Sequence, residues 1–506
     1  MSDHGIDATF TDLPARALAD AALQRAKDLG ATHADFRLER IRNQYLVVRD
    51  GRLQTATDTE DLGLAVRVVY RGAWGFAAGV VLTVAEAVRL AEQAVQVATV
   101  AAPMTADPVQ LAPEPVYRDV TWSSSYRVNP FGVATADKSE VLIDWTRQLL
   151  RSGAVDHATA SLLAVQENKF YADLAGTVTT QQRIRMHPEF EAMGADERTG
   201  VFDSMRSIAP PAGRGWEYVA EAGYDWDTEL ARTPELLAEK LTAPSVQAGD
   251  YDLVIDPSNL WLTIHESIGH ATELDRALGY EANYAGTSFA TLDQLGTLQY
   301  GSSAMNVTGD RTTEHGLASI GYDDEGVATQ SWDIISDGVL VGYQLDRSMG
   351  AAHPELNDGR SNGCAYADSP GHIPIQRMAN VSLQPASSGP DTDGLISQVE
   401  RGLYIVGDKS WSIDMQRFNF QFTGQRFHQI IDGELGPQVR DAAYQATTTD
   451  FWGSMEAVGG PQTYVLGGAF NCGKAQPGQV ASVSHGCPSA LFRSVRILNT
   501  TAEAGK

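Results

Sequence analysis

The sequence is poor in basic residues relative to acidic ones. Its 64 Asp and Glu residues against 38 Lys and Arg give a formal net charge of −26. Surfaces that bind nucleic acids or anionic membranes need clusters of Lys and Arg, so this balance argues against both kinds of partner. It does not identify a substrate, because acidic surfaces commonly serve only solubility.

Cysteine and long apolar runs are also scarce. Cys364, Cys472 and Cys487 are too few, and odd in number, for a disulfide framework. They indicate a reducing compartment, in which a special cysteine is a ligand or nucleophile rather than a cross-link. No stretch approaches 18 uncharged apolar residues, and residues 1–10 lack the basic and apolar regions of a signal peptide. We therefore expect a cytoplasmic protein without a membrane span.

The first half of the chain contains a repeat. With 506 residues, two or three domains are expected. Residues 12–30 and 138–151 have helical periodicity, and each is followed by strand-like runs and by a closing helix, predicted to start after Thr83 and Thr233. Asn43-Gln-Tyr-Leu and Asn168-Lys-Phe-Tyr correspond at an offset of 125. The prediction is an α/β domain over residues 1–244, built from two diverged helix–meander–helix subdomains at about 1–115 and 116–244. The alternative is two unrelated α+β stretches that both need a Gly turn.

The second half has a different pattern. Residues 251–255 indicate a buried strand, which leads into a helix predicted at about residues 258–277. From residue 300 onward, β-type runs alternate with Gly turns. We expect an α+β protein whose C-terminal domain, residues 245–506, is mostly antiparallel β and carries one long helix.

That helix contains the sequence His265-Glu266-Ser267-Ile268-Gly269-His270. Zinc hydrolases use His as ligand and Glu as general base, but the usual spacing is one residue shorter. Residues five apart lie about 140° apart on a regular helix. Two ligands to one metal therefore require a π-bulge, or a helix that ends between them, at about residues 267–270. Gly269 would make such a distortion easy.

A metal site needs a third ligand, and spacing does not select one. Cys472, His485, Cys487 and Cys364 are all candidates, and each lies far along the chain. The alternative to a metal site is two hydrogen-bonded core histidines. Against it, an apolar helix face that also carries two His and a Glu has unpaired polar groups unless something binds them.

These residues resemble a known family. The His265–His270 motif with Glu273, the following Gly286-Thr287-Ser288, and the segment 468–479 around Cys472-Gly-Lys474 are similar to the signature of the TldD/PmbA family of zinc peptidases. Segments 358–380, 34–39, 48–53 and 62–68 fit the same family. The resemblance spans nearly the whole chain and implies an α/β N-terminal region, a β-rich metallopeptidase domain and a dimer.

The resemblance also implies roles for single residues. His265, His270 and Cys472 would be Zn²⁺ ligands, and Glu266 would deprotonate the zinc-bound water. PmbA-type paralogues lack the His-Glu pair, so this chain resembles the catalytic TldD type. The loop between His270 and Gly286 and the segment Ser484-His-Gly-Cys487 depart from the family pattern, and the latter leaves a rival ligand open.

The sequence supports three functional hypotheses. The first is a zinc metallopeptidase that cuts unfolded or flexible peptides, with Arg360 and Arg377 as candidate substrate-binding or oxyanion-stabilising residues. The second is a non-catalytic or regulatory subunit that pairs with an active paralogue. The third is a zinc hydrolase for a non-peptide amide or ester. A thiolate ligand favours Zn²⁺ over Mn or Fe, and the dimer is either a homodimer or a heterodimer with a PmbA-type subunit.

Overall fold

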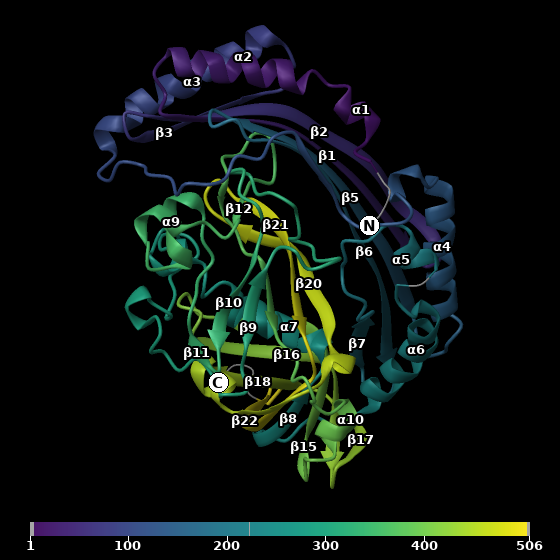
Figure 1. The fold of residues 1–506 in the computed structure, drawn as a ribbon. Coiled ribbons are helices and arrows are strands. Elements are labelled where there is room, and N and C mark those ends of the chain that lie inside the picture. The colour runs from purple at the N-terminus through teal and green to yellow at the C-terminus, as the bar shows by residue number, and fades with distance from the viewer. Residues whose placement is uncertain (1–4, 222, 503–506) are drawn as a thin grey trace.

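The structure is a computed structural model that describes residues 5–221 and 223–502. Its N-terminal half is one seven-stranded sheet in the order β3-β2-β1-β5-β6-β4, with β7 beside β6. Helices cover the outer face of this curved sheet, and the C-terminal half lies against the inner face (Figure 1). The elements are α1 Ala8–Thr11, α2 Ala15–Asp28, β1 His33–Arg49, β2 Arg52–Tyr70, β3 Ala73–Gly79, α3 Val84–Ala101, β4 Val120–Ser123, α4 Thr135–Leu149, β5 His157–Asp173, β6 Val178–Asp196, β7 Val201–Arg206, α5 Glu217–Ala220 and α6 Trp226–Thr242.

The predicted repeat is present as two matching units of this sheet. β1 and β5 each have 17 residues, and β2 and β6 each have 19. β5 starts at His157, 124 residues after His33, and β6 starts at Val178, 126 residues after Arg52. Strands β1 and β5 pair antiparallel along almost their whole length. The two helix–meander–helix units therefore form one continuous sheet.

Each unit has its own apolar core under its helices. In the first unit, α2 and α3 bury Leu18 and Leu90 on the sheet, and in the second, α4 and α6 bury Trp145 and Leu237. These side chains recur at helical spacing, which is why the amphipathic pattern predicted the helices. The two cores lie side by side on one face of the sheet, which leaves the other face free to contact the C-terminal half.

The two closing helices differ in how well their starts were predicted. α3 begins directly after Thr83, whose hydroxyl accepts from the backbone as predicted. α6 begins earlier than predicted, because Asp225 caps it by accepting from the backbone N of Thr228 at 3.1 Å. Thr233 and Pro234 consequently lie inside the helix, where the Thr233 hydroxyl bonds the preceding turn. Asp is a stronger N-cap than Thr, which explains the choice.

The C-terminal half is β-rich and mostly antiparallel. Its largest sheet has the order β15-β8-β22-β18-β16-β17, and an additional pairing of β15 with β16 closes a ring of strands. Among the described strands of this sheet, β8 and β15 pair parallel and the other pairs are antiparallel. The elements are β8 Gly249–Ile255, α7 Pro257–Ile264, α8 Leu274–Ala277, β9 Val307–Asp310, β10 Ser331–Ser336, β11 Val339–Leu340, α9 Arg347–Ala352, β12 Ala365–Tyr366, β13 Ile375–Gln376, β14 Asn380–Leu383, α10 Thr392–Ile396, β15 Arg401–Ile413, β16 Asn419–Ile431, β17 Glu434–Val439, β18 Ala442–Thr447, α11 Thr448–Gly453, β19 Met455–Val458, β20 Val465–Lys474, β21 Gln479–Cys487 and β22 Ala490–Asn499.

The motif helix is segmented. The sequence predicts one long helix over about residues 258–277, but the structure has α7, a π-turn at His265–Gly269 and then the separate short helix α8. Asp256 caps α7 and Pro257 occupies its first position, which fixes the start. The chain leaves the helical path after the π-turn, and residues 270–273 connect it to α8.

Buried ion pairs join the two halves. The inner face of the N-terminal sheet carries Arg67 and Lys169, which meet the acidic loop Asp324-Glu325 of the C-terminal half. Lys169 Nζ lies 2.7 Å from Asp324, and Arg67 lies 3.0 Å from Glu325. Gly326 has a φ of +74° at the end of this loop, and a Cβ there would lie 2.7 Å from the Tyr171 ring. These contacts therefore fix the position of the N-terminal sheet relative to the acidic loop of the C-terminal half.

The predicted domain boundaries fall between regular elements. Residue 115 lies between α3 and β4, and residue 244 lies between α6 and β8. Among the described residues, no helix combines the length and apolar character needed to cross a membrane.

Candidate metal centre

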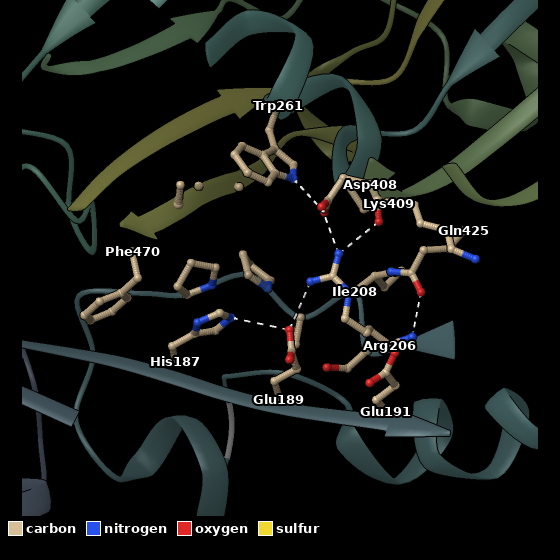
Figure 2. Close-up of a pocket in the computed structure, with 18 of the residues that line it drawn as sticks. His187, Glu189, Glu191, Arg206, Ile208, Trp261, Asp408, Lys409, Gln425 and Phe470 are labelled. Carbon is tan, nitrogen blue, oxygen red and sulfur yellow. Dashed lines mark hydrogen bonds and ion pairs between the residues drawn. The ribbon is translucent and has the colours of Figure 1, made fainter. Parts of the chain in front are cut away.

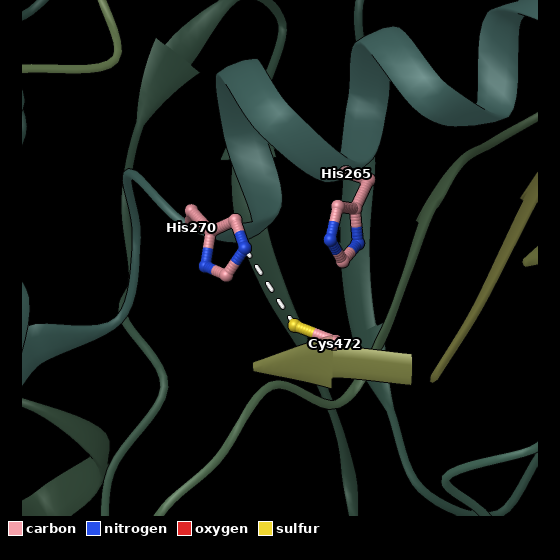
Figure 3. Close-up of side chains that lie close together, drawn as sticks. All are labelled: His265, His270 and Cys472. Carbon is pink, nitrogen blue, oxygen red and sulfur yellow. Dashed lines mark hydrogen bonds between the residues drawn. The ribbon is translucent and has the colours of Figure 1, made fainter. Parts of the chain in front are cut away.

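Three side chains named from the sequence meet at one point. The metal-binding atoms of His265, His270 and Cys472 all lie within 4.8 Å of one another, and all three residues are buried. Figure 3 shows both rings and the thiol facing a shared space. Cys472 Sγ lies 3.6 Å from His270 Nε2. A tetrahedral zinc ion with ordinary bond lengths would hold such a nitrogen and sulfur about 3.5 Å apart, so the donor set fits Zn²⁺.

A π-turn brings the two histidines together. The backbone N of His270 donates to His265 O at 3.0 Å, which is the i→i+5 bond of a π-turn. Their ring centroids lie 4.7 Å apart. The expected bulge is thus present at residues 265–269, overlapping the predicted range of 267–270. The extra residue is what places the second histidine above the first.

Side chains stabilise the carbonyls that the π-turn displaces from ordinary helical bonding. Ser267 Oγ donates to Thr263 O at 2.6 Å, and Gln344 Nε2 donates to Gly269 O at 2.7 Å. Gly269 is needed for packing rather than for backbone freedom. A Cβ at this position would lie 2.6 Å from Met378 Sδ. The φ of Gly269 is not positive, so its backbone conformation does not require a glycine.

A carboxylate and a lysine orient His270. Its Nδ1 lies 2.8 Å from Glu273 Oε2, and Lys474 Nζ donates to Glu273 Oε1 at 3.1 Å. Burial raises the pKa of Glu273, but Lys474 and His270 outweigh it and hold this pKa well below its usual range. The ionised carboxylate keeps the proton on His270 Nδ1, so the Nε2 lone pair faces Cys472. This explains the lysine in the Cys472-Gly-Lys474 motif.

The thiol of Cys472 is suited to bind a metal. Burial raises its pKa, but His270 and the nearby Arg377 outweigh burial, so the pKa lies below its ordinary value. The other cysteines lie elsewhere. Burial raises the pKa of Cys364 to about 12 and that of Cys487 well above its usual range. Cys487 Sγ lies 3.7 Å from Pro257 O, a contact that indicates a structural role for this thiol.

Glu266 has a partner that the sequence did not indicate. Arg417 Nη1 donates to Glu266 Oε2 at 2.6 Å, and Trp411 also hydrogen-bonds this carboxylate. Burial raises the pKa of Glu266, but His265, His270 and Arg417 together lower it below its ordinary value. Arg417 is 151 residues away in sequence, on the turn between β15 and β16. The carboxylate is therefore ionised beside the metal-binding atoms.

The Gly286-Thr287-Ser288 motif positions the turn that carries Arg417. Gly286 has a φ of +88°, and a Cβ on it would lie 2.0 Å from Met415 O. Thr287 N donates to Met415 O at 2.8 Å, and Phe289 N donates to Gln416 O at 2.9 Å. The motif therefore helps to hold Arg417 in place, although nothing in the sequence links the two segments.

The two other arginines predicted from the sequence lie in different places. Arg377 is buried and donates to the backbone carbonyls of Cys472 and of Gln479, the latter at 3.0 Å. It thereby holds β20 and β21 where Cys472 enters the site. Arg360 is partly exposed and pairs with Glu114 of the N-terminal half at 2.7 Å.

A cavity of about 540 Å³ lies between the two halves of the molecule (Figure 2). Its walls come from both halves, because Arg206 of β7 bonds Glu189 of β6 at 3.2 Å and Asp408 of β15 at 3.0 Å. Trp411 lines it and contacts Glu266, and Asn471, next to Cys472, lines it too. The cavity thus borders neighbours of the candidate centre, whereas His265, His270 and Cys472 are not among its lining residues.

Family models match both parts of the chain. Residues 248–499 match the PmbA/TldA metallopeptidase C-terminal domain, and residues 34–98 match the PmbA/TldA metallopeptidase domain 1. The chain belongs to the PmbA/TldD metallopeptidase family. The C-terminal match contains the whole cluster from His265 to Cys472.

Individual relatives of the PmbA/TldD family match this chain over nearly its full length. A metalloprotease of Methanothermobacter thermautotrophicus is 27% identical over 92% of this chain and 96% of its own. A zinc metalloprotease TldD homologue of Saccharolobus solfataricus is 21% identical over 94% and 98%. TldE from Thermococcus kodakarensis has the same fold, with a TM-score of 0.72 at 15% identity over 94% and 99%. A Thermotoga maritima protein proposed to modulate DNA gyrase also shares it, with a TM-score of 0.74 at 16% identity over 95% and 99%.

Proposed function

We propose that the protein is a zinc-dependent metallopeptidase that hydrolyses peptide bonds in unfolded or flexible peptides. The observation that carries the proposal is the convergence of His265, His270 and Cys472 beside the ionised Glu266. Two imidazoles and a thiolate make a typical set of three protein ligands for a zinc ion that keeps one open position. The names of the relatives as metalloproteases support the same reaction.

The proposed chemistry assigns a role to each residue. Zinc, when held by the three ligands, would polarise the scissile carbonyl and lower the pKa of water. Glu266 takes the proton of the attacking water and passes it to the leaving amine. The Arg417 guanidinium, already 2.6 Å from Glu266, donates to the oxyanion that develops on the substrate. Arg377 supports Cys472, and a substrate-binding role for Arg360 stays a prediction.

The edge of β20 that does not pair with β21 favours the proposal that the substrate binds as an extended peptide. Among the described residues, β20 pairs with β21 alone. Residues 467–471 of β20 line the cavity, and the strand then leads to Cys472. A peptide that pairs with a strand edge is recognised mainly through its backbone. Folded proteins cannot offer such a segment, so flexible peptides are the proposed substrates.

The test combines metal content with hydrolysis of one polypeptide in its unfolded and folded forms. We expect stoichiometric zinc in the native chain and faster cleavage of the unfolded form. Glu266→Gln keeps the zinc but loses activity by about 10²–10⁴-fold, because only the base is removed. Cys472→Ala loses both zinc and activity, whereas Cys487→Ala, the matched control, keeps both.

Other outcomes would identify the competing hypotheses. A native chain without stoichiometric zinc excludes the peptidase and favours a regulatory subunit. Zinc with hydrolysis of small esters or amides, but not of peptides, favours the non-peptide hydrolase. Equal cleavage of folded and unfolded forms excludes the preference for flexible peptides. The dimer, with a second copy or a PmbA-type partner, stays a prediction that light scattering of the purified chain measures.

A further inference from the structure

The segment Ser484-His485-Gly486-Cys487 forms the end of β21 and lies next to His265 of the candidate centre. His485 is completely buried, and both of its ring nitrogens are engaged. Its Nδ1 lies 2.8 Å from Val381 O, and its Nε2 lies 2.7 Å from His265 Nδ1. A backbone carbonyl and a metal-site imidazole are thus connected through a second imidazole.

The carbonyl acceptor at one end determines where each proton lies in this series of hydrogen bonds. Val381 O is a carbonyl and only accepts, so the proton of His485 is on Nδ1. The Nε2 of a neutral imidazole then accepts, and it accepts from His265 Nδ1–H. His265 Nε2 is left with its lone pair, on the side of His270 and Cys472. We propose that His485 is a positioning residue that holds His265 in the tautomer and ring orientation needed to bind the metal through Nε2.

The surroundings of His485 fix it in this position. Trp261 stacks on its ring at a centroid distance of 6.3 Å and an interplanar angle of 11°. The adjacent Gly486 donates its N–H to Ser382 Oγ at 2.9 Å, and Ser484 N bonds Asn380 Oδ1 at 3.1 Å. These bonds tie β21 to β14, the strand that supplies Val381 O. Donor and acceptor are therefore held by the same pair of strands.

His485 is positioned to support a ligand rather than to be one. Among the described residues, the cluster with converging metal-binding atoms consists of His265, His270 and Cys472. The Nε2 of His485 is directed at the His265 ring instead. The two ligand histidines are thus oriented differently: His270 by the ionised Glu273, and His265 by a neutral imidazole. Partners of this kind typically change metal affinity by about 10–100-fold.

The inference rests on the proposed zinc centre, and zinc affinity measured by chelator competition tests it independently of activity. His485→Leu removes both hydrogen bonds and should weaken zinc binding about 10–100-fold. His485→Gln offers one acceptor and one donor, so it should restore affinity to within about threefold of the native chain. Cys487→Ala, two residues along the same buried strand, should bind zinc like the native chain. The thermal midpoint of each metal-free variant shows whether a change reflects folding instead.

Each result has one interpretation. Native-like zinc affinity in His485→Leu overturns the positioning role while leaving the proposed function intact. A loss in His485→Gln as large as in His485→Leu also overturns it, because His485 would then act as a ligand. Absence of zinc from the native chain removes the proposed function itself. Cobalt substitution adds a second readout: His485→Leu should alter the visible absorption of the bound Co²⁺, and His485→Gln should preserve it.

Discussion

Two of the sites at which the molecule buries charged side chains differ in what the pairing of charges holds in place. Between the halves, Lys169 Nζ lies 3.2 Å from Glu39 and 2.7 Å from Asp324, so opposite charges face each other directly. At the candidate metal centre, Lys474 pairs with Glu273, which in turn holds His270. There the series of contacts ends at His270 Nε2, which lies 3.6 Å from the thiol of Cys472.

This comparison separates a structural charge cluster from a functional one. Burying charges costs free energy that close pairing recovers only in part. At the interface, the pairing serves the contact between the sheet and the acidic loop. At the centre, the same kind of pairing fixes protons so that electron pairs converge on one point. Variants that break one cluster should therefore leave the property of the other unchanged.

The largest effect on stability is expected from Lys169→Met. This change removes the buried cation nearest to Glu39 and Asp324 and leaves them with Arg37 alone, at 3.4 and 3.3 Å, which should destabilise the protein by about 3–5 kcal/mol. The midpoint of urea unfolding measures the change, and the exposed Lys27→Met serves as control. Zinc content should stay native in the folded variant. A midpoint like that of the control would mean that the interface pairs are not needed for stability.

Arg417→Ala should reduce catalysis without removing the metal. Loss of one oxyanion donor typically costs about 10²–10³-fold in kcat. We expect that loss on the unfolded polypeptide, native zinc content, and partial recovery when free guanidinium is added. Arg401→Ala, an exposed arginine on the same hairpin, is the control. A change in KM alone, with kcat preserved, would assign Arg417 to substrate binding instead.

A smaller effect concerns the pH dependence of stability. Burial raises the pKa of Glu39 from 4.5 to about 7, against the opposing effects of Lys169 and Arg37. The folded state then binds the proton more tightly, so this contribution is complete below pH 4.5 and is lost as pH rises through 7. Its size is at most about 3 kcal/mol. In Glu39→Gln, the midpoint of urea unfolding should change less with pH between about pH 5 and pH 8 than it does in the native chain.

The control for this measurement is Glu60→Gln, an exposed carboxylate on the neighbouring strand. It should keep the native pH profile. If Glu39→Gln and the native chain have parallel profiles, Glu39 is not the titrating group at the interface.

The pattern of apolar residues predicted much of the fold, because it is local. Helical spacing over residues 138–151 and the offset of 125 between the two units reflect short-range packing, and both are present in the structure. The continuous motif helix was not predicted correctly in its length. A π-turn depends on distant side chains such as Gln344, and no local pattern records them.

The candidate site was predicted in part for the same reason. His265, Glu266 and His270 share one turn, so their chemistry was visible in six residues of sequence. Cys472 emerged from the family resemblance, since 202 residues separate it from His270. Arg417 was missed, and His485 was considered only as a rival ligand. Neither role has a spacing rule, because each depends on how two strands lie against the π-turn.

By itself, the sequence determined the two helix–meander–helix units, the β-rich second half and the kind of chemistry at residues 265–270. Those features depend on periodicity and on residue type, which neighbours in the chain define. Only the tertiary structure decided how close Cys472 lies to the histidines, which arginine meets Glu266, and that His485 faces His265 rather than the point shared by the three candidate ligands. Each of these is a contact between distant segments, and its geometry exists only after the strands have packed.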